Sequence, residues 1–338
     1  SEMCIRDRWK GESDAQPYVP GMVEMMKEKG FAHMSEGALV VDVKEDTDTK
    51  EIPPCIILKS DGASLYSTTD LATLVMRMKE NNPDRVIYLA DARQSMHFIQ
   101  VFRCARKTGI VPDTTELVHI GFGTMNGKDG KPFKTRDGGV MRLEYLLKEI
   151  DDEMLNKIKE NQKEKENLNI DEAEAKQTAK TVALAAVKYG DLSNQASKDY
   201  IFDIDRFTSF EGNTGPYILY TIVRIKSILS KYEAKGGDIS ALKDAIMPAV
   251  NAGQKNLMLS LAKFNATIES AYEESAPHKI CAYIYELANA FNGFYHDTKI
   301  LSEENEELKK SYISLLVLTK EILEACIDML GFSAPDRM

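Results

Sequence analysis

A glycine-rich segment at residues 121–139 carries the densest group of side chains that could act on phosphate. It holds six glycines and four cations, and the last three cations are Lys131, Lys134 and Arg136. Flexible backbone and cations suit a loop that closes over phosphates and stabilises charge as it develops on an oxyanion. The segment contains no Walker string. A basic surface hairpin is an equally open interpretation, because the Asp-Gly pair at 129–130 favours a turn.

Asp70 lies close to the start of a predicted helix. If Thr68 or Thr69 opens this helix, Asp70 falls in its first turn, where the helix dipole favours a carboxylate without any ligand. The alternative is a carboxylate that binds a cation, with Tyr66 as an aromatic wall about one turn away.

Gln94 and His97 follow an apolar strand predicted at 86–90. Ligands in open α/β sheets bind just outside the carboxyl ends of the strands, so both side chains are candidates for facing a ligand. A surface or capping histidine with satisfied hydrogen bonds is the alternative for His97.

Thr214 and Pro216 predict the start of a helix on which Tyr217, Tyr220 and Arg224 share one face. Two aromatic rings and a cation suit stacking with unpaired bases. A face that packs against another helix has much the same pattern, so both interpretations stay open.

The elements that must position these residues change in kind near residue 143. Between residue 70 and that point, strands that alternate with helices predict a parallel, doubly wound sheet, and two further strands separated by a polar turn precede them. The strands are expected at 38–43, 55–58, 86–90 and 116–121, and the helices at 20–30, 70–80 and 95–108. A Glu- and Lys-rich stretch at 151–180 is expected to be a solvated connector. Long helices follow, predicted at 215–234, 238–250, 254–271, 278–292 and 306–330. An α/β module therefore precedes an all-α module.

Composition excludes several classes of protein. The 338 residues are 43% hydrophobic, which is enough for two or three folded domains and excludes a disordered chain. No apolar run reaches the roughly 18 residues of a membrane span, and the N-terminus has no secretory signal. The net charge of −10 argues against general nucleic-acid coating but allows a local basic patch. Five scattered cysteines without a C-x-x-C pair argue against disulfides or a protein-bound metal, and favour a reduced cytoplasm.

Six strings spread along the chain resemble arginyl-tRNA synthetase, a class I aminoacyl-tRNA synthetase, and they follow the order of that family. They are D-G-A-S-L-Y-S-T-T-D-L-A, D-A-R-Q-S-M-H-F, H-I-G-F-G-x-x-x-G-K-D-G-K-P-F-K-T-R, V-K-Y-G-D-L-S, S-F-E-G-N-T-G-P-Y and G-F-S-A-P-D-R-M. The resemblance runs from about Val19 to Met338, so it covers nearly the whole chain.

The resemblance implies that Tyr66, Asp70 and Gln94 line an arginine pocket, with His97 towards the aminoacyl or adenylate group. The chemistry agrees, because a carboxylate is the matching bidentate acceptor for the rigid donor fork of a guanidinium.

The resemblance also implies that the glycine-rich segment is the family's version of the KMSKS loop. Lys131, Lys134 and Arg136 would then neutralise phosphates as the α-phosphorus of ATP is attacked and pyrophosphate leaves. The string at 119–122 resembles the H-I-G-H motif of class I synthetases. It lies immediately before the phosphate loop, however, whereas the true motif belongs far upstream.

The helical tail resembles the anticodon-binding domain of the family. The resemblance implies that Tyr217, Tyr220, Tyr295 and the terminal Met338 contact tRNA. Arg224, on the same helical face as the first two, is expected to contact tRNA with them.

The domain organisation expected from the resemblance is a partial Rossmann-like nucleotide-binding domain followed by a helical bundle. The H-I-G-H half and the N-terminal extension of the family have no counterpart, so we expect a C-terminal part of the enzyme that is inactive alone. The expected boundaries are a non-native leader at 1–8, part of an insertion in the catalytic domain at 9–60, the second half of the Rossmann-like domain at 61–150, a helical connector at 151–212 and a DALR-like anticodon-binding domain at 213–338.

The function implied is that of an arginine–tRNA ligase in translation, which forms arginyl-adenylate from ATP and transfers arginine to its tRNA. L-arginine, arginine tRNA and ATP with Mg²⁺ as its counter-ion are the expected partners, and the full-length enzyme is expected to be a cytoplasmic monomer without membrane contact. The alternative is a non-catalytic tRNA-binding or structural synthetase-like protein. A synthetase-like paralogue with an unrelated substrate is a third hypothesis, which the joint presence of Tyr66, Asp70 and Gln94 disfavours.

Overall fold

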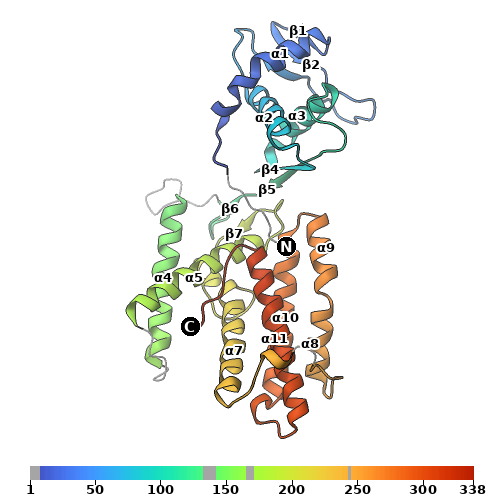
Figure 1. The fold of residues 1–338 in the computed structure, drawn as a ribbon. Coiled ribbons are helices and arrows are strands. Elements are labelled where there is room, and N and C mark those ends of the chain that lie inside the picture. Colours follow the sequence, from blue (N-terminus) through green and yellow to red (C-terminus); the bar gives the residue numbers. More distant parts are fainter. Residues whose placement is uncertain (1–7, 132–141, 165–170, 243–244) are drawn as a thin grey trace. The chain divides into compact units, whose positions relative to one another are not determined.

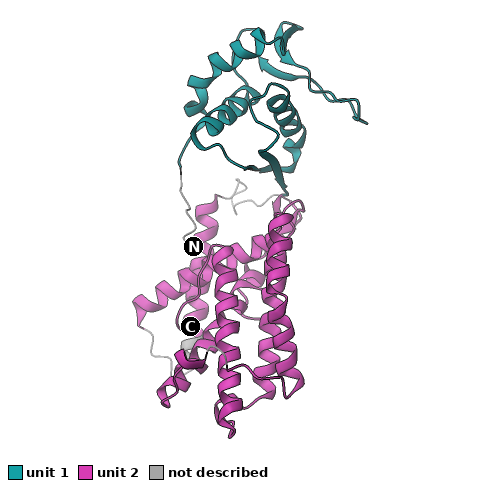
Figure 2. Cartoon of the chain, turned by 45° about the vertical axis from the view of Figure 1, so that its right-hand side comes forward, with its two compact units in different colours: residues 1–123 teal, residues 124–338 magenta. Residues whose placement is uncertain are grey.

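The chain forms two compact units, residues 1–123 and 124–338 (Figure 2). The computed structural model describes residues 8–131, 142–164, 171–242 and 245–338. Figure 1 follows the order of the elements along the chain. Among the described residues, no helix combines the length and the apolar character that crossing a membrane requires.

The described residues of the first unit form a three-stranded antiparallel sheet, a parallel strand pair and three α-helices. Strand β2 lies between β1 and β3, whereas β4 pairs in parallel with β5 from Arg85↔Glu116 to Asp91↔Phe122. The elements are η1 (Glu12–Tyr18), α1 (Val19–Glu28), β1 (Ala32–Ser35), β2 (Ala38–Val41), β3 (Cys55–Leu58), α2 (Tyr66–Asn81), β4 (Arg85–Asp91), η2 (Ala92–Gln94), α3 (Ser95–Lys107) and β5 (Glu116–Phe122).

The core of this unit lies between the helices and the strands. Leu71 and Leu74 of α2 and Val101 of α3 are buried in one cluster with Val86 of β4. Strand β4 buries Val86 but leaves Leu89 72% exposed, so its residues alternate between a packed face and an open face.

The second unit is a helical assembly. Its elements are β6 (Met125–Asn126), α4 (Leu143–Glu164), α5 (Glu172–Leu192), β7 (Tyr200–Ile201), α6 (Ile204–Phe207), α7 (Gly215–Ala234), η3 (Ser240–Leu242), α8 (Ala252–Ala262), α9 (Phe264–Glu273), α10 (Pro277–Asp297), η4 (Ile300–Ser302) and α11 (Glu306–Met329). One hydrophobic cluster of the described residues joins side chains from α4 through α11.

The V-K-Y-G-D-L-S and E-G-N-T-G-P-Y strings meet inside this cluster. The buried hydroxyl of Tyr189 lies 2.5 Å from Oδ1 of Asn213 and 2.9 Å from the carbonyl oxygen of Cys281, so both are acceptors for its proton. Burial raises the pKa of Tyr189 above its ordinary value. Gly215 lies against α5, where an added Cβ would fall 2.3 Å from the carbonyl oxygen of Ala185. Only a residue without a side chain permits this approach of α7 to α5.

Two short strands join residues 124–126 of the glycine-rich segment to a part of the helical unit that is distant in sequence. Strand β6 pairs in parallel with β7, and the backbone N–H of Phe202 donates to the carbonyl oxygen of Asn126 at 2.8 Å. The backbone N–H of Thr124 donates to Oδ1 of Asp199 at 2.6 Å. These bonds hold residues 124–126 in the helical unit.

Several sequence predictions need correction. No helix spans 238–250, where the described residues form only η3, because two glycines precede it and Pro248 follows. The helix predicted at 254–271 is two helices, α8 and α9, divided at Lys263. The stretch at 151–180 is not merely solvated, since Met154 of α4 and Ala179 of α5 lie in the core. Strands β1, β6 and β7 were not anticipated.

Candidate functional site

Asp70 and His97 come together between α2 and α3. Oδ2 of Asp70 lies 2.6 Å from Nε2 of His97, and the two side chains are 31% and 27% exposed. The pair is therefore accessible to a ligand, and the hydrogen bond holds each of the two side chains in its orientation.

The helix that carries Asp70 begins earlier than the sequence predicts. Leu65 is its N-cap residue and Tyr66 its first residue, and the Leu65 backbone N–H donates to Oγ1 of Thr68 at 2.8 Å. Thr68 in turn donates to the carbonyl oxygen of Ile57 on β3 at 2.5 Å. Asp70 consequently lies in the second turn, where the helix dipole alone explains its presence less well.

Tyr66 and Gln94 lie close to the pair in sequence but are exposed. Tyr66 is one turn before Asp70 on α2, and Gln94 ends η2 immediately before α3. Among the described residues, neither side chain makes a hydrogen bond to Asp70 or His97. The structure thus unites two of the four predicted residues and leaves the other two on adjoining surface.

The turn that carries Gln94 is shaped by an ion pair. Arg93 donates from Nε and Nη2 to the two carboxylate oxygens of Asp91 at 2.9 and 2.6 Å, and its backbone N–H donates to Oδ1 at 2.8 Å. These bonds hold the pKa of Asp91 at about 2. Gly121 of β5 is close behind this turn, since an added Cβ would fall 2.8 Å from Cα of Ala92.

A small cavity opens beside Asp70. It has a volume of about 280 Å³, and Asp70, Arg77, Glu80 and Tyr88 are among its lining residues. Arg77 lies 5.0 Å from the centre of the Tyr88 ring, and burial raises the pKa of Tyr88 to about 12.

Residues 127–131 of the glycine-rich segment form a turn. The backbone N–H of Gly130 donates to the carbonyl oxygen of Gly127 at 2.9 Å, and that of Gly127 donates to the carbonyl oxygen of Lys131 at 2.8 Å. Gly130 has a φ of 71°. Lys131 is exposed on this turn, whereas Lys134 and Arg136 lie outside the described residues. Lys128 is held by Asp203 at 3.1 Å and Asp205 at 3.2 Å, which raises its pKa.

The string at 119–122 forms the end of β5. His119 stacks on Phe98 of α3, with ring centres 4.4 Å apart. Nε2 of His119 is buried and, among the residues described, has no hydrogen-bond partner.

In the helical unit, Arg224 lies against two tyrosines. Its guanidinium carbon is 4.7 Å from the ring centre of Tyr220 and 5.4 Å from that of Tyr295, which brings α7 and α10 together. Tyr295 is 42% exposed and stacks on the buried Phe291. This arrangement presents a cation and aromatic rings at the surface, which suits unpaired bases and phosphates.

Tyr217 belongs to the same side of α7 and, like Tyr220 and Arg224, is half-buried. Its hydroxyl donates to Oδ1 of Asn289 at 2.6 Å and accepts from Nδ2 of Asn292 at 2.9 Å. Sequence reasoning missed these two asparagines. The available signal was their three-residue spacing in A-N-A-F-N-G-F-Y, which aligns two amides along an otherwise apolar helix. Met338 is half-buried and packs against the helical core.

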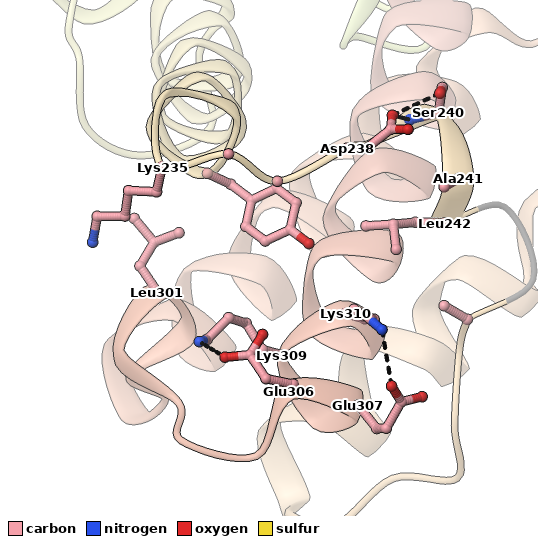
Figure 3. A pocket seen from close by; sticks show the side chains of 14 residues that line it. Lys235, Asp238, Ser240, Ala241, Leu242, Leu301, Glu306, Glu307, Lys309 and Lys310 are labelled. Carbon is pink, nitrogen blue, oxygen red and sulfur yellow. Dashed lines mark hydrogen bonds and ion pairs between the residues drawn. The ribbon is translucent and has the colours of Figure 1, made fainter.

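A larger cavity of about 930 Å³ lies between the segment after α7 and the start of α11 (Figure 3). Two of its lysines are paired, Lys309 with Glu306 at 2.6 Å and Lys310 with Glu307 at 2.9 Å. Across the parts of the chain that the structure describes, no group of three or more His, Cys, Asp or Glu side chains could hold a metal ion.

Two family models match this chain, and the first match extends beyond the first unit into the second. The family described as tRNA synthetases class I (R), catalytic domain, matches residues 2–204, and the DALR anticodon binding domain matches residues 218–338. The arginine–tRNA ligase of Alkaliphilus oremlandii is 54% identical over 332 residues, which cover 98% of this chain and 55% of the relative. That of Francisella tularensis subsp. tularensis is 42% identical over 334 residues, with the same two coverages of 98% and 55%.

A solved structure has the same fold. The crystal structure of arginyl-tRNA synthetase from Plasmodium falciparum aligns with a TM-score of 0.82 at 26% identity, covering 99% of this chain and 55% of that one. The chain spans about half the length of the curated relatives that it matches. By its catalytic-domain match, its DALR domain and these relatives, the chain belongs to the arginine (R) family of class I tRNA synthetases.

Proposed function

We propose that this chain supplies the tRNA-binding unit and part of the catalytic unit of an arginine–tRNA ligase. The observation that carries the proposal is the Tyr220–Arg224–Tyr295 cluster, which lies within the part matched by the anticodon-binding family. Bases of a single-stranded loop would stack on the rings, and the guanidinium would pair with phosphate or a base. Tyr217 and Met338 would border this surface.

In the first unit, Asp70 would accept hydrogen bonds from the guanidinium of L-arginine, with Tyr66 and Gln94 beside it. His97 would hold Asp70 in place through their 2.6 Å hydrogen bond and lie towards the adenylate. A carboxylate whose second oxygen is held by a neighbour is oriented before the ligand arrives, which reduces the entropic cost of binding.

Lys131, Lys134 and Arg136 would act on ATP rather than on arginine. The carboxylate oxygen of arginine attacks the α-phosphorus, pyrophosphate leaves, and a hydroxyl of the tRNA then takes the arginyl group and releases AMP. The cations would stabilise the charge that grows on the phosphates. Mg²⁺ would arrive as the counter-ion of ATP. We place this activity in the cytoplasm and in a monomeric full-length enzyme.

A binding experiment tests the proposal on the chain as it is. Arginine tRNA should bind more tightly than an unrelated tRNA, and Tyr220→Ala should weaken that binding about tenfold, since stacking on an aromatic contributes roughly 1–3 kcal/mol per base. Tyr272→Ala is the matched control, because Tyr272 is an exposed tyrosine of α9.

Circular dichroism separates RNA binding from packing. If Tyr220→Ala loses helical signal, the ring serves the helical core. If the variant stays folded and binds arginine tRNA like the unchanged chain, the proposed RNA face is wrong. A second assay measures arginine-dependent exchange of pyrophosphate into ATP, which we expect to be absent with this chain alone. The chain is then joined to the portion of a relative that lies outside the match. Exchange in the joined protein would indicate part of a ligase, and its absence would indicate a non-catalytic tRNA-binding protein.

A further inference from the structure

Four polar side chains form a continuous hydrogen-bonded network between α7 and α10. Nη1 of Arg224 donates to Oδ1 of Asn292 at 2.5 Å, and Nδ2 of Asn292 donates to the Tyr217 hydroxyl at 2.9 Å. That hydroxyl donates to Oδ1 of Asn289 at 2.6 Å. A weaker contact of 3.4 Å joins Nδ2 of Asn292 to Thr221.

The direction of this network follows from its first member. A guanidinium has donors only, so the atom of Asn292 that faces Arg224 must be the amide oxygen. The Asn292 amide nitrogen then faces Tyr217, whose oxygen accepts and whose proton is left for Asn289. The oxygen of Asn289 must therefore face Tyr217, and its amide nitrogen must face away. Arg224 thus fixes the orientation of an amide that it does not touch.

Asn289 is exposed, and among the described residues its amide nitrogen has no hydrogen-bond partner. Two N–H donors are consequently presented beside the face that carries Tyr217, Tyr220 and Arg224. Unpaired bases are recognised by stacking together with hydrogen bonds to their edges. A fixed pair of donors matches the oxygen or ring-nitrogen acceptors of a base edge.

We propose that Asn289 reads the edge of one unpaired base of the tRNA, and that Asn292 is the positioning residue that orients it through Tyr217. The inference rests on the proposed function, because it requires that this face binds tRNA. Stacking on the tyrosines tolerates any base, whereas the amide donors distinguish bases by their acceptors. The network therefore adds base selectivity to a surface that otherwise provides affinity.

The experiment measures equilibrium binding of the full chain to transcripts of arginine tRNA in which each anticodon-loop base is replaced in turn. For one position, replacement should weaken binding to the unchanged chain about tenfold and have no effect on Asn289→Ala. Asn292→Ala and Tyr217→Phe should lose the same selectivity, since both interrupt the network before Asn289. The ratio of affinities for the two transcripts is the readout, because a general loss of structure lowers both affinities alike.

Asn265→Ala is the matched control, since Asn265 is an exposed asparagine on the neighbouring α9, and it should retain full selectivity. Should Asn289→Ala fail to fold, Asn289→Asp keeps the acceptor for Tyr217 and removes the donors, so it should also lose selectivity.

The failures are distinguishable. If Arg224→Ala weakens tRNA binding while Asn289→Ala discriminates every loop base like the unchanged chain, the inference is overturned and the proposed function stands. If the unchanged chain binds arginine tRNA no better than an unrelated tRNA, the proposed function itself fails.

Discussion

Asp70 and His97 are 27 residues apart in sequence, yet Oδ2 of the carboxylate lies 2.6 Å from Nε2 of the imidazole. The bond joins the second turn of α2 to the first turn of α3 and occupies one carboxylate oxygen. Among the described residues, Oδ1 of Asp70 has no hydrogen-bond partner, so one acceptor atom is held ready for a ligand.

Asp70→Asn should weaken the use of arginine. The test uses residues 9–338 joined to the portion of the Alkaliphilus oremlandii relative that lies outside the match. Removing one charge from a charged hydrogen-bonded pair costs about 2–5 kcal/mol, so kcat/KM for arginine should fall about 30-fold or more. Asp84→Asn changes an exposed carboxylate shortly after the same helix and should have no effect. Unchanged kinetics in Asp70→Asn would remove Asp70 from the arginine site.

Lys134→Ala should slow adenylate formation in the same joined protein. Lys134 is expected to act on charge that is largest in the transition state, and loss of one such donor costs roughly 10²–10³-fold in rate. Arginine affinity should hardly change. Single-turnover formation of the adenylate is the measurement, and an unaltered rate would mean that the segment is only a basic surface turn.

Gly215→Ala should destabilise the helical unit. The added Cβ would fall 2.3 Å from the carbonyl oxygen of Ala185, so α7 and α5 must separate, at a cost of about 1–3 kcal/mol. Gly293→Ala is the control, because nothing lies within 4 Å of its added Cβ on α10. The control should stabilise the unit by up to ~1 kcal/mol. Urea midpoints measured by circular dichroism at constant m-value provide the comparison. Equal midpoints for the two variants would contradict the close helix approach.

Asp48→Asn should lower the melting temperature of the first unit at pH 7. Arg103 donates to both carboxylate oxygens of Asp48 at 2.7 and 2.8 Å, and with the Glu45 backbone N–H this lowers the pKa of Asp48 from 3.8 to about 2. A depressed pKa stabilises the folded state above pH 3.8, and the contribution is lost as pH falls through about 2.

The difference in melting temperature between Asp48→Asn and the unchanged chain should therefore become smaller from pH 4 to pH 2. Calorimetry over this pH range measures it. Asp46→Asn, an exposed carboxylate in the same loop, should follow the unchanged chain throughout. A difference that persists undiminished at pH 2 would mean that the ion pair is not its source.

The long amphipathic helices were largely predictable from sequence. The prediction of 215–234 matches α7 exactly in extent, because Thr214 caps it and Pro216 lies in its first turn. The start of α2 was not predictable from its threonines, since the N-cap is Leu65, whose side chain cannot cap, and Thr68 caps from inside the helix. The hydrogen bond from Thr68 to Ile57 of β3 is a tertiary contact, which local helix propensity does not reveal.

The candidate sites follow the same division. The six sequence strings identified the candidate residues, and helical spacing was enough to place Tyr220 and Arg224 on one face of a helix. The partner that completes this face, Tyr295, comes from α10, and the meeting of α7 with α10 depends on packing across the bundle. The network through Asn292 was invisible for the same reason, because its four members are ordered only when both helices are in place.

The pairing of β6 with β7 has a practical consequence. Residues 124–126 are hydrogen-bonded to 199–202, and α4 and α5 share one hydrophobic cluster, so non-covalent contacts join the parts of the chain that precede and follow the link between these two helices. A protease site engineered between α4 and α5 should yield two polypeptides that co-elute as one particle. That outcome would mean that the unit assembles without a covalent link at this point and could accept an inserted reporter domain there.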